Sequence, residues 1–117
     1  MKHSIGKSFA GIAGTPQEIF IVPNGYIAVV YMVFITNTSG SSGSYTMSWR
    51  HAHNNYTDVI RFAYGKSLGS GESDNFSAGE LIMKSLDKMT VTSANSVDVI
   101  VTFDLLKAPS LYTFAGE

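Results

Sequence analysis

The sequence predicts an all-β protein, an antiparallel β-sandwich of about seven or eight strands with a jelly-roll-like or immunoglobulin-like arrangement. Two observations predict this class. Short segments that are apolar, or that alternate apolar and polar residues, are separated by turns rich in Gly, Ser and Asn. No segment combines a helical spacing of apolar residues with capping residues at its ends. A chain of 117 residues is the size of one domain, with a single core between two layers.

The first half of the chain begins with residues 1–17, which contain several Gly and Ser residues and show no period. We expect this segment to be an extended arm. Further along, Pro23-Asn24-Gly25 predicts a turn, because proline presets one backbone dihedral angle and Asn-Gly tolerates positive φ. The strands expected in this half are Glu18–Val22, Tyr26–Asn37 and Ser44–Arg50, the last with Tyr45, Met47 and Trp49 on one face.

The strand Tyr26–Asn37 is apolar at both parities from Tyr26 to Ile35. A strand with one face in water alternates, whereas a strand without alternation has both faces covered. A sandwich of this size has one interior, and we therefore expect neighbouring protein chains to cover the second face. The candidate interface residues on this strand share one parity: Ile27, Val29, Tyr31, Val33 and Ile35.

The second half of the chain predicts further short strands. The clearest is Ser96–Leu105, because its apolar residues occupy every second position and Asp98 and Asp104 lie on the opposite face. The segment Gly65–Ser77 is rich in Gly and Ser and predicts one short strand and a long loop. The remaining strands expected are Thr57–Tyr64, Glu80–Lys84 and Met89–Thr92.

The domain organisation that follows is an arm over residues 1–17, a β-sandwich over residues 18–106 and a tail over residues 107–117. Pro109 discourages the last strand from continuing into the tail. The tail carries large apolar side chains that could reach a neighbouring chain: Leu111, Tyr112 and Phe114.

Composition and charge exclude several functional classes. Charged residues are 15% of the chain, against roughly 25% in an average domain, which fits a subunit that buries part of its exterior. The net charge of −1, with no basic cluster, predicts no nucleic-acid partner. The absence of cysteine excludes disulfides and zinc–thiolate sites. The apolar run in Tyr26–Asn37 is too short for a membrane helix, which needs about 20 residues, and no signal peptide is evident.

The candidates for chemistry are few. His51 and His53 could be two metal ligands on one face of a strand, but no third histidine follows them, and we favour a polar strand end. Asp98 and Asp104 would lie about 20 Å apart along a strand, too far for a catalytic acid and base. Trp49 with Tyr45, or the region of Tyr56 and Tyr64, could stack on a sugar, but the alternation of Trp49 and Tyr45 with Ser and Thr favours the core for these two. We therefore predict no cofactor, no metal and no enzymatic activity.

Four segments together resemble a known class of proteins: IFIVPNGYIAVV, ITNTSG, LIMKSLDKMTVTSA and SVDVIVTFDLL. In this order they are similar to small virion structural proteins of tailed bacteriophages, which are all-β subunits that decorate a capsid or form rings at the neck and tail. The resemblance covers Glu18 to Leu106. Two features depart from it: Leu86 stands where a glycine is usual before the aspartate, and the chain continues past the last strand.

The resemblance implies a non-enzymatic structural protein of a phage virion, made in the cytoplasm of the bacterial host. Its expected partners are further copies of itself, as a trimer or dimer, and the major capsid protein or other virion proteins. A capsid decoration or cement subunit is the preferred interpretation. The alternatives are a neck, collar or tail subunit, a carbohydrate-binding module for host attachment, and a small metal enzyme that uses His51 and His53.

Overall fold

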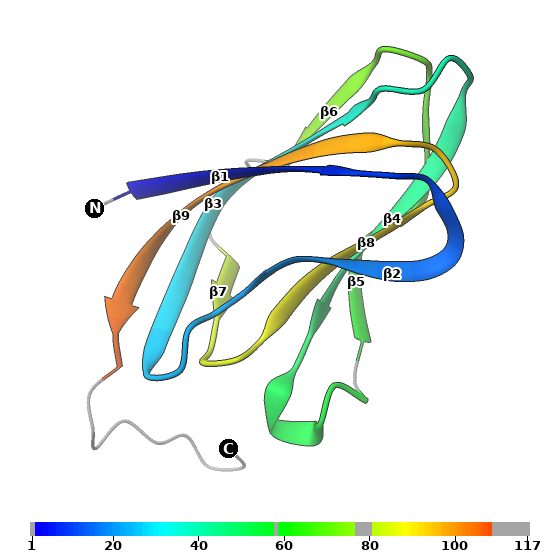
Figure 1. Ribbon diagram of the computed structural model, residues 1–117. Coiled ribbons are helices and arrows are strands. Elements are labelled where there is room, and N and C mark those ends of the chain that lie inside the picture. Colours follow the sequence, from blue (N-terminus) through cyan, green and yellow to red (C-terminus); the bar gives the residue numbers. More distant parts are fainter. Residues whose placement is uncertain (1, 58, 77–80, 109–117) are drawn as a thin grey trace.

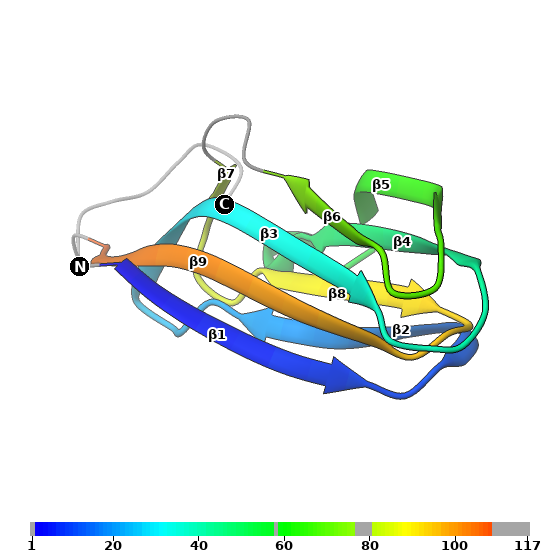
Figure 2. The ribbon, with the colours of Figure 1, turned by 90° about the horizontal axis from the view of Figure 1, so that it is seen from above.

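The computed structural model describes residues 2–57, 59–76 and 81–108 and confirms the all-β sandwich. Two antiparallel sheets pack face to face (Figures 1 and 2). Sheet A has five strands in the order β1-β9-β3-β6, with β7 also paired to β3, and sheet B has four in the order β2-β8-β4-β5. Early and late strands are neighbours in both sheets, which is the arrangement of a double-sheet jelly roll.

The strand bounds give nine strands in the described residues, rather than the seven or eight expected. The additional strand is β1, which lies in the segment expected to be an arm, whereas β6 and β7 pair with β3 at separate places along it. A short 3₁₀-helix, η1, occupies Ala52–Asn54 between β4 and β5. The strands are β1 (Lys2–Phe9), β2 (Ile12–Ile21), β3 (Tyr26–Asn37), β4 (Gly43–Arg50), β5 (Val59–Leu68), β6 (Ser73–Phe76), β7 (Leu81–Met83), β8 (Lys88–Ser93) and β9 (Val97–Lys107).

The segment expected to be an arm was residues 1–17, but residues 2–9 form β1 of sheet A and residues 12–17 belong to β2 of sheet B. β1 pairs with β9 from Lys2 opposite Asp104 to Phe9 opposite Val97, and β2 pairs with β8. Ile5 and Phe9 pack against the core from the inner face of β1. The Gly and Ser residues of β1 give it no apolar alternation that would predict a strand. The pairing that stabilises it is with β9, at the far end of the chain. Of the expected tail, only Lys107 and Ala108 are described.

The core lies between the two sheets, and on β4 and β9 it uses the faces that the alternation predicted. Val97, Val99 and Val101 of β9 are buried, as are Tyr45 and Met47 of β4. The rings of Phe20 and Phe103 stack across the sheets with their centroids 5.1 Å apart. Burying apolar surface of this kind supplies most of the driving force for folding.

A tight turn joins β7 to β8 at the point where the resemblance lacks its usual glycine. Leu86 in this turn has φ of 68°, in the left-handed region that favours glycine. The turn is held in place because the Leu86 N–H donates to the Val22 carbonyl at 2.9 Å, and the Val22 N–H donates to the Asp87 carbonyl at 3.0 Å. The turn therefore keeps the backbone shape of a glycine position while carrying a leucine.

We expect the order of stability of glycine and alanine to be inverted at this position. At an ordinary strand position glycine costs about 0.5–1 kcal/mol relative to alanine, whereas a side chain in the left-handed region costs about 1–2 kcal/mol. Leu86→Gly should therefore melt at a higher temperature than Leu86→Ala. The control pair is Ser44→Gly and Ser44→Ala at an exposed site in β4, where alanine should melt higher. The same order at both sites would contradict this account of the turn.

Candidate assembly surface on the outer face of sheet A

A β-bulge in β3 decides which of its apolar residues face the core. The register of β3 against β9 shifts between Val30 and Met32, so that Tyr31 is the extra residue. Ala28 and Val30 face the core before the bulge, and Val33 and Ile35 face it afterwards. Because an extra residue reverses the alternation, the five odd-numbered candidates do not share one face.

The candidate residues of β3 therefore divide between the two faces. Val33 and Ile35 lie in the core with 3% and 0% of their surface exposed. Ile27, Val29 and Tyr31 lie on the outer face, where Val29 is buried and the other two are half-buried. The three candidates in the tail, Leu111, Tyr112 and Phe114, lie outside the described residues.

Neighbouring strands extend the apolar outer face beyond β3. Ile100 of β9 lies opposite Phe34, Leu106 of β9 opposite Ile27, and Ile82 of β7 opposite Val29. Ile82, Leu106 and Ile100 are exposed by 52%, 51% and 45%, and their position on one face of the sheet is more informative than the exposure of any one of them. We call this set the sheet A patch: Ile27, Val29, Tyr31, Met32, Phe34, Ile82, Ile100 and Leu106.

Sequence reasoning missed the most exposed members of the patch, although a signal was present. Ile100 interrupts the polar face of β9 between Asp98 and Thr102, and an isoleucine at a position expected to face water indicates a partner. Ile82 lies at the centre of the apolar triplet of β7 and gave no such signal. Only the pairing of β7 with β3 brings it beside Val29.

The acidic groups at the margin of the patch already have partners within the chain. The Ser8 hydroxyl donates to Asp98 at 2.6 Å, and the Tyr31 hydroxyl donates to Asp104 at 2.8 Å. The hydrogen bond from Tyr31 lowers the pKa of Asp104, and the positive charge of Lys2 acts in the same direction. The Lys2 ammonium lies over the Tyr31 ring, 4.7 Å from its centroid. A partner could therefore cover these acids while their hydrogen bonds remain.

The outer face of sheet B has the opposite character. Thr46 lies opposite Thr92 and Ser48 opposite Thr90 in the pairing of β4 with β8, and Arg50 donates a hydrogen bond to Thr90 at 3.3 Å. The exposed apolar residues of sheet B lie on its two edge strands instead: Ile12 and Ile21 on β2, and Ile60 and Tyr64 on β5. The molecule is thus polar across the centre of one sheet and apolar across the centre of the other.

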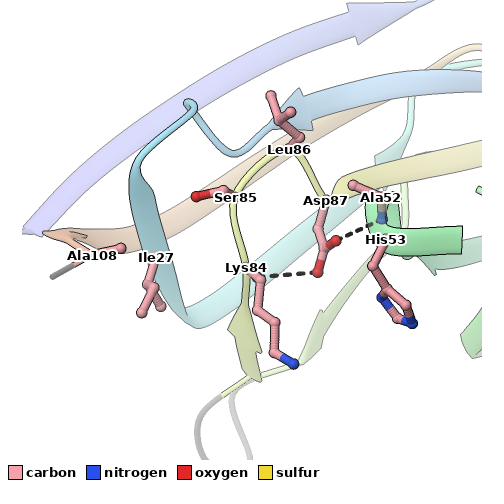
Figure 3. Close-up of a pocket in the computed structure, with 8 residues that line it drawn as sticks. All are labelled: Ile27, Ala52, His53, Lys84, Ser85, Leu86, Asp87 and Ala108. Atoms are coloured by element: carbon pink, nitrogen blue, oxygen red, sulfur yellow. Dashed lines mark hydrogen bonds between the residues drawn. The ribbon is translucent and has the colours of Figure 1, made fainter. Parts of the chain in front are cut away.

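A cavity of about 340 Å³ opens between β3, η1 and the turn after β7 (Figure 3). Asp87 belongs to its lining and is almost fully buried. Its carboxylate accepts N–H bonds from the Trp49 indole at 2.9 Å, from Ala52 at 2.8 Å and from Lys84 at 3.1 Å. Both carboxylate oxygens are engaged with the chain, so Asp87 ties the end of β4 to the start of β8 and is poorly placed to act on a ligand.

Of the two histidines that suggested a metal site, His53 lines this cavity. The ring centroids of His51 and His53 are 5.4 Å apart, and His51 precedes η1 rather than continuing a strand. Within the described ranges, no three His, Cys, Asp or Glu side chains gather as metal ligands would. The side chains of His53 and Lys84 extend in the same direction from the cavity (Figure 3).

The aromatic residues weighed as sugar platforms are mostly internal. Tyr45 is buried, as expected, and Trp49 is half-buried with its indole bonded to Asp87. Tyr64 is exposed, with the Arg61 guanidinium 5.4 Å from its ring centroid. Among the described residues there is also no helix with the length and hydropathy to cross a lipid bilayer.

The fold has counterparts among solved structures. A chain from a structure of Bacillus endospore appendages, a family of disulfide-linked pili, is 13% identical, with a TM-score of 0.53 over 93% of this chain and 88% of that chain. A chain from the acid-stable capsid structure of the Helicobacter pylori bacteriophage KHP30 is 13% identical, with a TM-score of 0.54 over 93% of this chain and 99% of that chain. At this identity the likeness concerns the fold alone. The sequence matches no protein-family model and no curated protein.

Replacing the Asp87 carboxylate should destabilise the protein strongly. Asp87→Asn keeps one oxygen acceptor but turns an amide N–H₂ toward backbone or indole donors, and we expect a loss of about 2–4 kcal/mol in the free energy of unfolding. Urea titration followed by Trp49 fluorescence measures the loss. Asp98→Asn, at an exposed acid with one hydrogen bond from Ser8, is the control and should cost less than about 1 kcal/mol. Equal losses would contradict the structural role of Asp87.

The contact between Tyr31 and Asp104 should make stability depend on pH in the acid range. A carboxyl whose folded pKa is lowered contributes stability above its unfolded pKa of about 3.9, and this contribution disappears as pH falls through the folded pKa. Tyr31→Phe removes the largest cause of the shift. It should melt below the parent at neutral pH, and the difference should shrink below about pH 3. Tyr26→Phe, at an exposed ring, is the control, and its difference from the parent should not change with pH.

Proposed function

We propose that this chain is a non-enzymatic structural subunit that functions by association with other protein chains. The observation that carries the proposal is the sheet A patch, an apolar surface across the centre of one sheet on a chain with few charged residues. Contiguous exposed apolar surface of more than a few hundred Å² is uncommon on monomeric proteins and marks interaction sites. The fold likeness to chains of a phage capsid and of a pilus supports the same role.

The finer proposal is a capsid decoration, or cement, subunit of a phage particle, with the major capsid protein as the partner of the patch. The resemblance to small phage virion proteins supports it, as does the fold shared with a chain of a phage capsid structure. The disulfide links of the pilus have no counterpart here, because this sequence contains no cysteine. A neck, collar or tail subunit would use the same surface and remains the alternative location.

The energetics favour many weak contacts over one strong one. Burial of apolar surface contributes about 25 cal/mol per Å², so a patch of a few hundred Å² contributes several kcal/mol before the costs of association. A single contact of that size is weak. On a symmetric particle each subunit can touch more than one neighbour, and simultaneous contacts raise the overall affinity without new chemistry.

A charge placed in the sheet A patch should weaken assembly while leaving the fold intact. We expect Ile82→Asp and Leu106→Asp to melt like the parent and to bind capsids of the encoding phage at least about tenfold more weakly, because each buries an unpaired carboxylate in the contact. Co-sedimentation with capsids and light scattering of the free protein measure the effect.

The matched control is Ile60→Asp, at a side chain with 50% exposure on β5 of sheet B, which should bind like the parent. Val33→Asp, in the core, should fail to fold and so reports on stability alone. Parental binding by both patch variants would overturn the proposed role of this surface.

A further inference from the structure

Three of the four sheet edges are built in ways that prevent regular pairing with another strand. β2 carries two register shifts against β8, contains Pro16, and has Gly14 at φ of 75°. The pairing of β5 with β4 has two register shifts, and Gly65 of β5 has φ of 56°. At the far edge of sheet A, β6 and β7 have four and three residues. Bulges, proline and short strands are the usual means by which proteins blunt an edge.

The fourth edge, β1, has no bulge and no proline and is not shortened, and the charges that can blunt an edge are limited on it to Lys2 and Lys7. It runs for eight residues, contains no proline and pairs with β9 from Lys2 to Phe9 without a register shift. In the part of the chain that the structure describes, no strand pairs with its other side. An edge strand of this length presents a row of backbone N–H and C=O groups to whatever chain approaches, and is a template for adding a strand.

We propose that β1 pairs, antiparallel and about a two-fold axis, with β1 of a second copy of this chain, so that sheet A of the two copies becomes one continuous sheet. The second copy is the natural partner because, in the described residues, β1 is the regular edge and a two-fold axis uses the same surface on both subunits. An axis perpendicular to the sheet keeps both sandwiches on the same side of it.

The charges of β1 disfavour a register centred on Lys7, and the open surface at Gly6 favours one centred there. Side chains on the same side of the sheet must oppose one another, and centring the axis on Gly6 places Lys7 opposite Ile5 of the second copy and Ser8 opposite Ser4 of the second copy. Centring it on Lys7 would oppose two lysines, which is unfavourable. Lys2 does not obstruct the pairing, because its ammonium lies back over the Tyr31 ring of its own sheet.

The surface around Gly6 has room for a close approach. Gly6 lies opposite Ile100 of β9, and a hollow of about 210 Å³ borders them on the edge, with Ser8 and Asp98 in its lining. A Cβ added at Gly6 would meet its nearest neighbours at 3.8 Å, an ordinary contact distance. Substitutions at Gly6 therefore change the edge without straining the subunit.

Cysteine cross-linking in the full chain tests the pairing, because the natural sequence has no cysteine. Opposed residues in an antiparallel pair have Cα atoms about 4.5–5.5 Å apart, within the range a disulfide spans. Gly6→Cys should form a disulfide-linked dimer under mild oxidation roughly tenfold faster than Ser67→Cys, an exposed control on β5, because opposed thiols have a high effective concentration. Ser8→Cys alone should cross-link slowly, and an equal mixture of Ser8→Cys and Ser4→Cys should cross-link fast.

A second measurement does not depend on the disulfide. Gly6→Lys would oppose two ammonium groups across the axis, so light scattering should show half the parental mass, whereas Gly6→Ala should keep it. Equal cross-linking at Gly6 and Ser67, or a parental mass for Gly6→Lys, would overturn the proposal.

These experiments use free protein without capsids, and their outcome is separable from that of the proposed function. Ile82 and Leu106 belong to strands β7 and β9, and their variants should retain the Gly6→Cys cross-link while losing capsid binding. Capsid binding without the cross-link would overturn the proposed β1 pairing and leave the proposed role of the sheet A patch standing. A cross-link without capsid binding would overturn the role of the patch and leave the β1 pairing standing.

Discussion

The pairing of β3 with β9 is the interaction on which the rest of the structure depends. It runs from Tyr26 opposite Lys107 to Asn37 opposite Val97, and every other strand of sheet A attaches to one member of this pair. Both strands are long, and the inner face of each supplies the centre of the core. About half of the chain separates the two strands, so the fold forms only when its distant parts meet. Long-range pairing of this kind is expected to make folding slow.

The apolar outer surface is a consequence of the same pair. A sandwich has one interior, and a strand that is apolar on both faces must leave one of them outside it. The bulge at Tyr31 settles which residues these are, and β7 and β9 then add Ile82, Ile100 and Leu106 around them. Because the centre of sheet B is lined by Ser and Thr, the molecule has two unlike sides. Such asymmetry suits a subunit that has one side against a partner and the other in solvent.

The turn at Leu86 and Asp87 shows how a departure from a pattern can be accommodated. The left-handed conformation persists with a leucine because hydrogen bonds to Val22 fix the backbone on either side of it. The neighbouring carboxylate adds three bonds to groups from β4, η1 and the turn itself. Local strain of this kind is tolerated where the surroundings determine the conformation. A buried carboxylate beside a cavity could be taken for a catalytic or ligand-binding group, but the contacts of Asp87 are structural.

Alternation and turn chemistry in the sequence were enough to predict the sandwich, most of its strands and the inner face of β9, since these depend on neighbours within a few residues. The doubly apolar character of Tyr26–Ile35 was also readable, and with it the expectation of a second covered surface. The tertiary structure alone decided that residues 2–9 form an edge strand, because their partner lies some 90 residues away, at Val97 to Asp104. It alone decided the division of β3 between core and surface, because one extra residue opposite β9 reverses the alternation and nothing local marks where that residue falls.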